Sequence, residues 1–488
     1  MGIKIAKTGT MVGLDIGADM IKVVEAKPGR DSIIVTGLGV APTPPGSFEN
    51  GAVVDPQAIG KAVKALLSEA GIRTKRVVCS VSGQGAMPSL VVRIIQVPNV
   101  SPEELKETMK WEIEKQVPFA PSEVVMDFHK IERIGQDPNA QTVDVLLAVA
   151  QQDMVNSQIS AIFASGLKPA ALDIQPLAAS RALIDIASNG STAMPTAIVN
   201  IGATVTDLSI FEGGVLAYPS PPISIAGVNF TQAIASALGV SDEEAERLKK
   251  ERARVDSQQM AALGGYSAEA PPSTGFDLGP EPPAPTMDSG AQPPDTPSAG
   301  FTDTLDGPVF DMGDEEKPQT GRQRFDLSAV PEEEGPKTYD LGGQRFEAHK
   351  PVFDLSEEEV GAAPAPAAGT PPSAPVPEQP AGDVGSRITQ AIAPVLQDLV
   401  GQIRLNLDYY RSRYNSQVEK IYLCGGTALM QGLSAYLSGE LGMPVAVADP
   451  LANVTVTSKS YSPQYVEEIS PMFSVSLGLA IRDLIVEG

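Results

Sequence analysis

A carboxylate, a glycine and a lysine lie close together near the amino terminus of this chain. Asp15, Gly17 and Lys22 fall within the sequence VGLDIGADMIKVVEA of residues 12–26. Backbone N–H groups next to a glycine can approach anionic oxygens, a carboxylate can hold a metal ion through bound water, and a lysine supplies a positive charge. These residue types favour a phosphate and metal site, although a D-x-G hairpin turn without a ligand has the same pattern.

The same design occurs a second time at Asn200. The triplet Ile-Gly-Ala stands at residues 16–18 and again at residues 201–203, each time after an apolar run that ends on a polar residue, and a further aspartate follows each copy, at Asp19 and Asp207. Two such turns can face each other and hold a polyphosphate from both sides. The pair is therefore more informative than either turn alone.

Strands joined by tight turns must present these residues. Alternating apolar and β-branched residues predict strands on both sides of each turn, and the first half continues with a strand over 33–40, a helix over 56–70 and a strand over 77–81. A small α+β insertion follows, in which Ser101, Pro102 and Glu104 form a capping box at the start of a helix. The remaining elements predicted for the insertion are strands over 90–97, 124–134 and 142–150 and a helix over 153–165, and a strand over 169–174 spans its end near residue 170.

The second half begins near residue 197 and is interrupted by an unusual tract. Residues 264–383 hold 21 of the 43 prolines, and their 23 acidic and 6 basic residues give a net charge of −17. Such a segment cannot bury enough apolar surface to offset its ordering entropy, so we expect it to be disordered. The ordered chain resumes with a long amphipathic helix from Ser386, a buried strand over 420–424 and a closing helix over 471–485 rich in small residues.

The acidic tract over residues 264–383 contains five short repeats. Each has an aromatic residue, an aspartate, a leucine or methionine, and a glycine or serine, and they start at Phe276, Phe310, Phe325, Tyr339 and Phe353. Drift of a duplicated low-complexity segment can explain them. We favour docking motifs for one partner surface, because tethered copies raise avidity without strong single contacts.

The composition of the chain argues against several classes of ligand and binding site. The net charge of −24 argues against nucleic acid and against direct electrostatic binding to an anionic membrane. Two cysteines and two histidines, without metal-ligand spacing, make a disulfide or a zinc site improbable and fit a reducing cytosol. Neither a signal peptide nor an apolar stretch long enough to span a membrane is evident.

Two Asp/Asn-Ile-Gly-Ala hairpins, the turn Gly425-Gly426-Thr427 after a buried strand, and a small-residue closing helix resemble the superfamily of actin, heat-shock chaperones and sugar kinases. The resemblance covers about residues 1–255 and 384–488. It implies an α/β fold of two actin-like ATPase halves, each RNase H-like, that bind ATP with Mg²⁺ between them.

The resemblance also implies roles for particular residues. Asp15 would hold the Mg²⁺ shell and Lys22 would contact phosphate. Gln175, at the start of the first hinge helix, would orient water or be only a polar residue of that helix. Glu246 and Lys249 would lie near the ribose and base, or form an exposed ion pair. The remaining positions that would contact the nucleotide are Gly17, Ala18, Gly202, Ala203, Thr204, Gly425, Gly426 and Thr427.

The insertion carries a closer resemblance, to the PilM family of type IV pilus assembly proteins. It rests on Val97-Pro98-Asn99-Val100-Ser101, Glu103-Glu104-Leu105, Trp111-Glu112 and Pro118-Phe119. The family implies a cytoplasmic scaffold, peripheral to the inner membrane, that docks the cytoplasmic N-terminal peptide of the membrane protein PilN and couples to the pilus motor ATPases. We expect Trp111 to pack within the insertion, with a role in the partner groove as the alternative.

One departure from the superfamily concerns catalysis. Asn200 stands where an aspartate is usual, so binding should survive better than hydrolysis, because a missing positioning group commonly costs phosphoryl transfer orders of magnitude. The catalytic candidates are Gln175 and Asn200.

The alternatives to a pilus assembly scaffold that binds ATP are an FtsA-like division protein, a type II secretion scaffold, a sugar kinase and a scaffold without ATPase activity. The predicted division of the chain is 1–91 and 92–170 for the first half and its insertion, 171–263 and 384–488 for the second half, and 264–383 for the linker.

Overall fold

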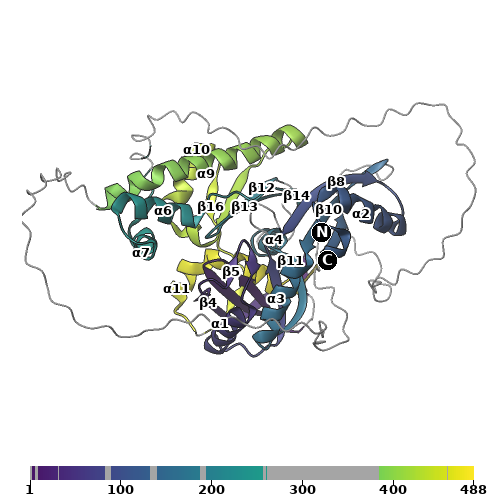
Figure 1. Ribbon diagram of the computed structural model, residues 1–488, viewed down its shortest axis with the longest axis horizontal. Coiled ribbons are helices and arrows are strands. Elements are labelled where there is room, and N and C mark those ends of the chain that lie inside the picture. Colours follow the sequence, from purple (N-terminus) through teal and green to yellow (C-terminus); the bar gives the residue numbers. More distant parts are fainter. Residues whose placement is uncertain are drawn as a thin grey trace, which may run out of the picture. The chain divides into compact units, whose positions relative to one another are not determined.

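The computed structural model describes residues 3–5, 9–30, 32–82, 89–131, 140–186, 194–256, 260, 384–458 and 460–487 (Figure 1). The linker predicted over 264–383, with its five repeats, lies outside the described residues. No helix in the described part of the chain is both long enough and apolar enough to cross a membrane.

A six-stranded sheet forms the centre of the first half, in the order β11-β7-β2-β3-β4-β17. Its strands are β2 (Met11–Ile16), β3 (Met20–Pro28), β4 (Ile33–Pro42), β7 (Arg76–Val81), β11 (Lys168–Ile174) and β17 (Thr455–Val456). Strands β2, β3 and β4 form an antiparallel meander, whereas β7 runs parallel to β2. The predicted strand-turn-strand at the first glycine turn is confirmed.

Helix α1 (Pro56–Glu69) packs on the first sheet. Its sequence shows where it begins and which of its faces is buried. Asp55 is the N-cap and accepts hydrogen bonds from the N–H groups of Gln57 and Ala58, and Pro56 occupies the first turn, where a missing N–H costs nothing. Ile59, Val63, Leu66 and Leu67 recur at helical spacing and are buried.

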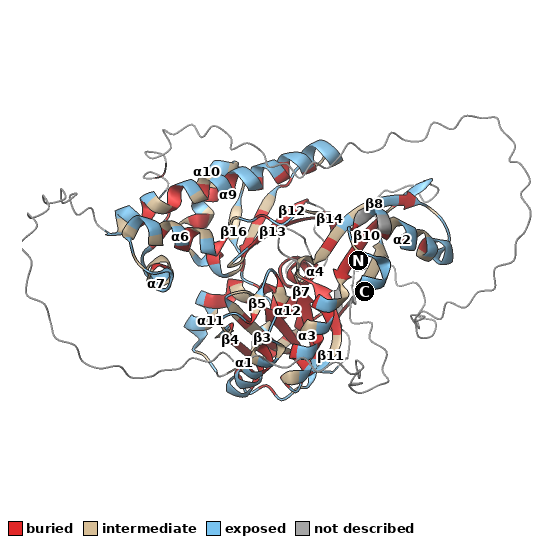
Figure 2. Ribbon diagram, in the orientation of Figure 1, coloured by how far each residue is buried: buried red, intermediate tan, exposed pale blue. Residues whose placement is uncertain are grey.

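The second half repeats this local topology in a five-stranded sheet of order β14-β13-β12-β15-β16. Strand β12 pairs antiparallel with β13 and parallel with β15, as β2 does with β3 and β7. The strands are β12 (Thr196–Ile201), β13 (Thr206–Glu212), β14 (Val215–Pro219), β15 (Lys420–Cys424) and β16 (Val445–Val447). The helices of this half are α6 (Gly227–Leu238), α7 (Asp242–Arg252), α9 (Val384–Tyr414) and α10 (Leu433–Leu441). Figure 2 shows buried strands in both sheets and exposed outer faces on the helices.

The insertion is a three-stranded antiparallel sheet with one helix on its face. Its elements are β8 (Leu90–Pro98), α2 (Pro102–Gln116), β9 (Val124–Lys130) and β10 (Thr142–Gln151), with β10 in the middle. Met109 and Ile113 of α2 pack in a separate core with strand residues such as Val97 and Leu147. The predicted capping box is present, because the Ser101 hydroxyl accepts from Glu104 N–H and the Glu104 carboxylate accepts from Ser101 N–H at 3.1 Å.

Two details differ from the sequence prediction. Helix α3 (Gln152–Ala164) was expected in the insertion, and the predicted boundary at residue 170 fell inside β11, but α3 packs on α1 and β11 pairs in parallel with β7 of the first half. The closing helix was expected to run to residue 485. Instead a 3₁₀ turn (Ser470–Phe473) leads into the short helix α12 (Ser474–Ala480), and β18 (Ile485–Glu487) follows and pairs with β1 (Ile3–Ile5). The placement of β11 and the end of the closing helix both depend on strand pairing with a distant segment. The periodicity of apolar residues along the chain does not show such pairing.

Two short helices cross where the halves meet. Helix α12 packs on β2 and on α4 (Gln175–Ser180), which continues as a π-helical turn (Arg181–Asp185). A side chain at Gly478 would overlap the carbonyl of Ala178, and one at Gly13 would overlap the carbonyl of Ser476. The small residues therefore let the backbones approach each other directly.

Replacing Gly478 with alanine should destabilise the protein by about 1–3 kcal/mol or more, because the new methyl group must displace a helix backbone. Thermal unfolding followed by far-ultraviolet circular dichroism measures the effect. Gly439→Ala on α10 is the matched control, since a Cβ there meets no atom within 4 Å. This control should gain about 0.5–1 kcal/mol from its higher helix propensity. Equal shifts in the two variants would contradict the close packing.

Candidate nucleotide site

A cavity of about 900 Å³ lies between the two halves, within the range of small-molecule and cofactor sites. Elements of both sheets line it, together with α6, α7 and the 3₁₀ turn Gly426–Leu429. All the site residues predicted from the sequence line this cavity: Asp15, Gly17, Ala18, Lys22, Gln175, Asn200, Gly202, Ala203, Thr204, Glu246, Lys249, Gly425, Gly426 and Thr427.

The first glycine turn is closed by backbone hydrogen bonds. Gly17 N–H donates to the Met20 carbonyl at 3.1 Å, and the Thr43 hydroxyl donates to the Gly17 carbonyl at 2.7 Å. A Cβ at Gly17 would lie only 3.1 Å from Lys22 Nζ. A glycine at this position therefore lets the lysine lie against the turn.

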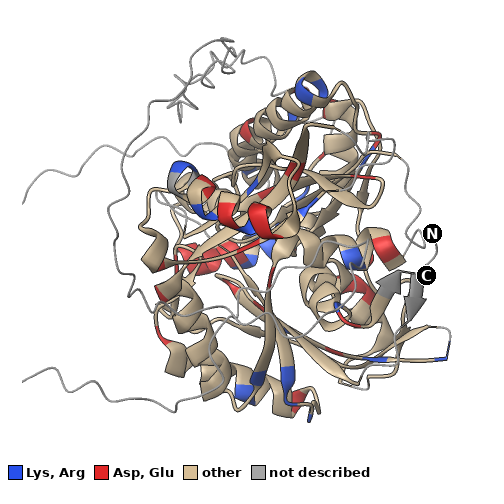
Figure 3. Ribbon diagram, turned by 90° about the vertical axis from the view of Figure 1, so that its right-hand side faces the viewer, with Lys and Arg blue, Asp and Glu red and all other residues tan. Residues whose placement is uncertain are grey.

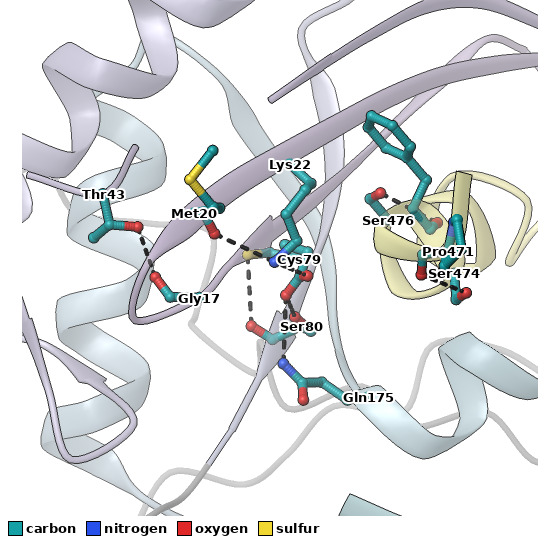
Figure 4. A network of polar contacts seen from close by, with 12 residues as sticks. Gly17, Met20, Lys22, Thr43, Cys79, Ser80, Gln175, Pro471, Ser474 and Ser476 are labelled. Atoms are coloured by element: carbon teal, nitrogen blue, oxygen red, sulfur yellow. Dashed lines mark hydrogen bonds and ion pairs between the residues drawn. The ribbon is translucent and has the colours of Figure 1, made fainter. Parts of the chain in front are cut away.

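The Asp15 carboxylate is the centre of a polar network at the cavity floor. Asp15 is 4% exposed and stands directly opposite Lys22 in the β2–β3 pair, with Lys22 Nζ 2.6 Å from Oδ2. Oδ1 accepts from the Ser80 hydroxyl at 3.1 Å and from Gln175 Nε2 at 3.3 Å. Figure 4 shows the side chains of Lys22, Ser80 and Gln175 close to one another. Ser80 was not predicted from the sequence, because only the parallel pairing of β7 with β2 places it beside Asp15.

The second turn has the same hydrogen bond. Gly202 N–H donates to the Val205 carbonyl at 2.9 Å, three residues on, as Gly17 does to Met20. Asn200 stands opposite Asp207 across the β12–β13 pair, as Asp15 stands opposite Lys22. Asp207 therefore corresponds in position to Lys22 and not, as the sequence comparison suggested, to Asp19.

Asp207 is a second functional candidate, which the sequence analysis noted but to which it assigned no role. It lines the cavity, and burial raises the pKa of its carboxyl to about 6, with the negative charge of Asp15 adding to the shift. The two hairpins thus differ in charge at equivalent positions. One presents a lysine and the other a carboxyl group that protonates near neutral pH.

Helix α6 and the double-glycine turn hold the second turn in place. Gly227 N–H donates to the Gly202 carbonyl at 3.0 Å and Val228 N–H to the Ala203 carbonyl at 2.7 Å, while the Thr427 hydroxyl also donates to Gly202 at 3.2 Å. These contacts fix the turn at the start of a helix, where backbone donors favour an anion.

Gly425 is required by the backbone fold, whereas Gly426 leaves open space in the cavity. Gly425 has φ +87°, and a Cβ on it would lie 2.6 Å from Asn200 Oδ1 and 2.5 Å from the Ile201 carbonyl. Gly425 is therefore required by the fold. Gly426 is exposed to the cavity, and a Cβ on it meets nothing within 4 Å. This position leaves room for a flat ligand group.

Glu246 and Lys249 form an ion pair, with Lys249 Nζ 2.5 Å from Oε2, but the alternative of an exposed surface pair is wrong. The side chain of Lys249 is 11% exposed and donates to the Gly227 carbonyl at 3.0 Å and the Thr231 hydroxyl at 2.9 Å. Burial opposes ionisation of Glu246, but hydrogen bonds from Lys249 and Thr231 outweigh it and lower its pKa. The pair is thus an ordered part of the cavity wall.

The donor set fits a nucleotide whose metal is held largely by water and phosphate. The described residues contain no cluster of three or more His, Cys, Asp or Glu side chains that could cage a metal ion. Mg²⁺ commonly binds proteins through one or two carboxylates and substrate phosphates. Asp15 can supply one such carboxylate beside the two glycine turns.

Trp111 has a different position from the one expected. The sequence predicted a packing role within the insertion, but the residue is 68% exposed on α2, so this prediction is wrong. The buried face of α2 is formed by Leu105, Met109 and Ile113 instead. Trp111 is left on the outer surface of the insertion.

Asp207→Asn should raise the free energy of unfolding at pH 7 by about 2–3 kcal/mol, because ionising a partly buried carboxyl group with a pKa of about 6, against 3.8 ordinarily, destabilises the folded state. The gain should be complete above pH 6 and vanish below pH 4, where the carboxyl is protonated in both states. Urea unfolding across this range measures it. The control is Asp19→Asn on the exposed turn, expected to change stability by less than about 0.5 kcal/mol. A gain at pH 4 as large as at pH 7 would contradict the assignment.

Several known proteins are similar to this chain, and one solved structure shares its fold. A chain of a solved structure, "PilM-PilN type IV pilus biogenesis complex", is 23% identical with a TM-score of 0.63, covering 98% of this chain and 99% of that one. The ethanolamine utilization protein EutJ from Carboxydothermus hydrogenoformans is 13% identical with a TM-score of 0.42, covering 98% and 92%. The cell division protein FtsA of Bacillus subtilis (strain 168) is 24% identical over 257 residues, which span 49% of this chain and only 57% of FtsA.

The fold predicted from the sequence, two actin-like halves with a small α+β insertion, is therefore confirmed. The sequence itself matches the family described as type IV pilus assembly protein PilM over residues 13–271 and 382–484, which is most of its length. The chain belongs to this family of type IV pilus assembly proteins.

Proposed function

We propose that this chain is a nucleotide-binding scaffold of type IV pilus assembly that holds ATP with Mg²⁺ between its two halves. The observation that carries the proposal is the pair of glycine turns, each closed by the same hydrogen bond and both lining one cavity with the open Gly426. Two sets of backbone donors on one cavity suit a chain of phosphates better than a single anion.

The residues take their roles from their positions. Asp15 would hold the water shell of Mg²⁺, and Lys22 would turn from Asp15 toward phosphate. The phosphate turns are Gly17, Ala18, Gly202, Ala203 and Thr204. Gly425, Gly426 and Thr427 would lie against the adenosine, with Glu246 and Lys249 near the ribose and base. Mg²⁺, when bound, would neutralise part of the phosphate charge.

Hydrolysis by this site should be slow or absent. Asn200 and Gln175 are the catalytic candidates, and Asn200 lacks the charge that positions water or metal in the resembling proteins. The structure offers a reason for the asparagine. A carboxylate at position 200 would directly oppose Asp207 across the strand pair, and like charges so placed are destabilising.

Gly426→Val should weaken ATP binding at least about tenfold, because the side chain projects into the cavity where the ligand must lie. Its folding should be unaffected, since no atom lies within 4 Å of the new Cβ. Isothermal titration with ATP, with Mg²⁺ and with EDTA, measures the affinity. Gly401→Val on α9 is the matched control, because its Cβ also meets nothing within 4 Å and it does not line the cavity.

Failure of the unchanged protein to bind ATP under both conditions would overturn the nucleotide proposal. Phosphate release from the same samples separates a slow ATPase from a scaffold that only binds. Comparison with Asn200→Asp would show whether the missing carboxylate limits turnover.

We further propose that the partner is the cytoplasmic N-terminal peptide of a PilN-like inner-membrane protein, with the pilus motor ATPases as further contacts. The fold similarity to a chain of the PilM–PilN complex and the family match support this. The protein would then lie in the cytoplasm, peripheral to the inner membrane through its partner. Trp111, exposed on the insertion, is the candidate aromatic anchor, since tryptophan is enriched among residues that dominate interfaces.

A peptide from the cytoplasmic end of the neighbouring membrane protein should bind this chain and shift the fluorescence of Trp111, the one tryptophan in its sequence. Trp111→Ala should weaken binding, followed by titration calorimetry, by about tenfold or more. Phe163→Ala, at a comparably exposed aromatic on α3, should not. Titrations with and without ATP test whether nucleotide controls the contact, and no binding in either state would remove this partner.

A further inference from the structure

Helix α9 carries an apolar pair on its outer face. Leu405 is 63% exposed and Tyr409 48% exposed, and four residues separate them, so they are neighbours on successive turns. Among the large exposed hydrophobic side chains of the described residues, this is the one pair so spaced on a helix. The opposite face of α9, including Ile403 and Leu407, packs in the core of the second half.

Aromatic packing holds Tyr409 in place. The Tyr409 ring lies 5.4 Å from that of Tyr218 on β14, and Tyr218 lies 6.3 Å from Tyr410. The Tyr218 hydroxyl donates to Asn406 Oδ1 at 2.8 Å. A ring already fixed in this way loses little freedom when another group packs on it, which favours binding.

The last turn of α9 carries two basic residues, Arg411 and Arg413. Arg413 follows Tyr409 by four residues and is exposed, so Leu405, Tyr409 and Arg413 lie in one row, which we name the α9 ridge. Figure 3 marks the acidic and basic positions along the ribbon, which on α7 separate into an acidic first turn and a basic last turn. An apolar row that ends in a cation suits a short peptide with an aromatic ring, an aliphatic side chain and a carboxylate.

Such peptides occur five times in this chain. The repeats beginning at Phe276, Phe310, Phe325, Tyr339 and Phe353 each join an aromatic residue, an aspartate and a leucine or methionine. They lie in a tract of net charge −17, so its field also favours a basic surface.

Both ends of that tract are anchored in the half that carries the ridge. Met260, before it, and Ile388, after it, belong to the same buried core, and the Thr389 hydroxyl donates to the Arg254 carbonyl at 3.2 Å. Tyr409 lies about 40 Å along the helix from Val384. A flexible chain of about 45 residues, the separation of Tyr339 from Val384, has a comparable r.m.s. span by the estimate of about 5–6 Å × √n. Matched tethers of this kind give effective concentrations near the millimolar range.

We propose that the aromatic–Asp–Leu/Met repeats dock in turn on the α9 ridge of their own chain. The ring and the aliphatic side chain pack on Leu405 and Tyr409, and the aspartate faces Arg413. One ridge and five copies mean that at most one repeat is bound at a time, so any other protein that uses the ridge must compete with a tethered ligand. This proposal does not depend on nucleotide binding.

Photo-crosslinking in the full-length chain tests it, with p-benzoylphenylalanine in place of Leu405. Crosslinked peptides identified by mass spectrometry should map to the repeats of the same molecule. The yield should fall about tenfold, the equivalent of one lost contact of about 1.4 kcal/mol, when the five aromatic residues are replaced. The replacements are Phe276→Ala, Phe310→Ala, Phe325→Ala, Tyr339→Ala and Phe353→Ala. Arg413→Glu should also lower the yield, and circular dichroism checks that each variant folds.

The same photo-reactive group in place of Phe163, 59% exposed on the first half, is the matched control. Crosslinks from position 405 to the repeats that do not exceed those from position 163, or that survive the five replacements, would overturn the proposal. Mixing isotopically labelled and unlabelled protein distinguishes the occupants. Crosslinks that join two copies would assign the ridge to a second molecule and would also overturn docking within one chain.

Discussion

The negative charge of a carboxylate buried beneath a cavity must be balanced by a positive charge and hydrogen-bond donors. Several elements of the first half supply these partners. Asp15 is 4% exposed, and its partners come from three different elements: Lys22 on β3, Ser80 on β7 and Gln175 at the start of α4. Leaving one partner of such a pair alone in a low-dielectric site commonly costs several kcal/mol. The register of the β2–β3 hairpin, the parallel strand β7 and the helix α4 therefore each place one partner of the Asp15 carboxylate.

The two halves share a backbone design but differ in charge. The hydrogen bond that closes each turn and the residue pair seven positions apart are the same, whereas Asp15–Lys22 in one half becomes Asn200–Asp207 in the other. Backbone geometry is what anion binding needs, and both halves keep it. The side chains that place charge have diverged, as expected if holding a ligand matters more than transforming it.

Local patterns in the sequence predicted the turns, the capping box on α2 and most strands, because hydrogen bonds within a few residues determine them. The predicted site residues also line one cavity, since turn glycines and strand ends fixed their positions. Ser80 was missed because it depends on pairing between strands that are distant in the sequence. Asp207 could have been found, because it follows Asn200 by seven residues as Lys22 follows Asp15. Trp111 was placed wrongly, because the shorter residues Leu105, Met109 and Ile113 already fill the inner face of α2. The assignment of α3 and β11 failed for the same reason as the end of the closing helix, namely pairing between distant segments.

The hydrogen bond from Thr389 to the Arg254 carbonyl has a consequence for how this chain can vary. It joins the segment before the linker to the helix after it, so the linker leaves and re-enters the fold at one closed junction. The entropy cost of closing a loop grows only with the logarithm of its length, about 0.6 kcal/mol for each doubling. By this estimate, a change in the number of residues between 260 and 384 should alter the loop-closure cost by well under 1 kcal/mol unless the segment doubles in length.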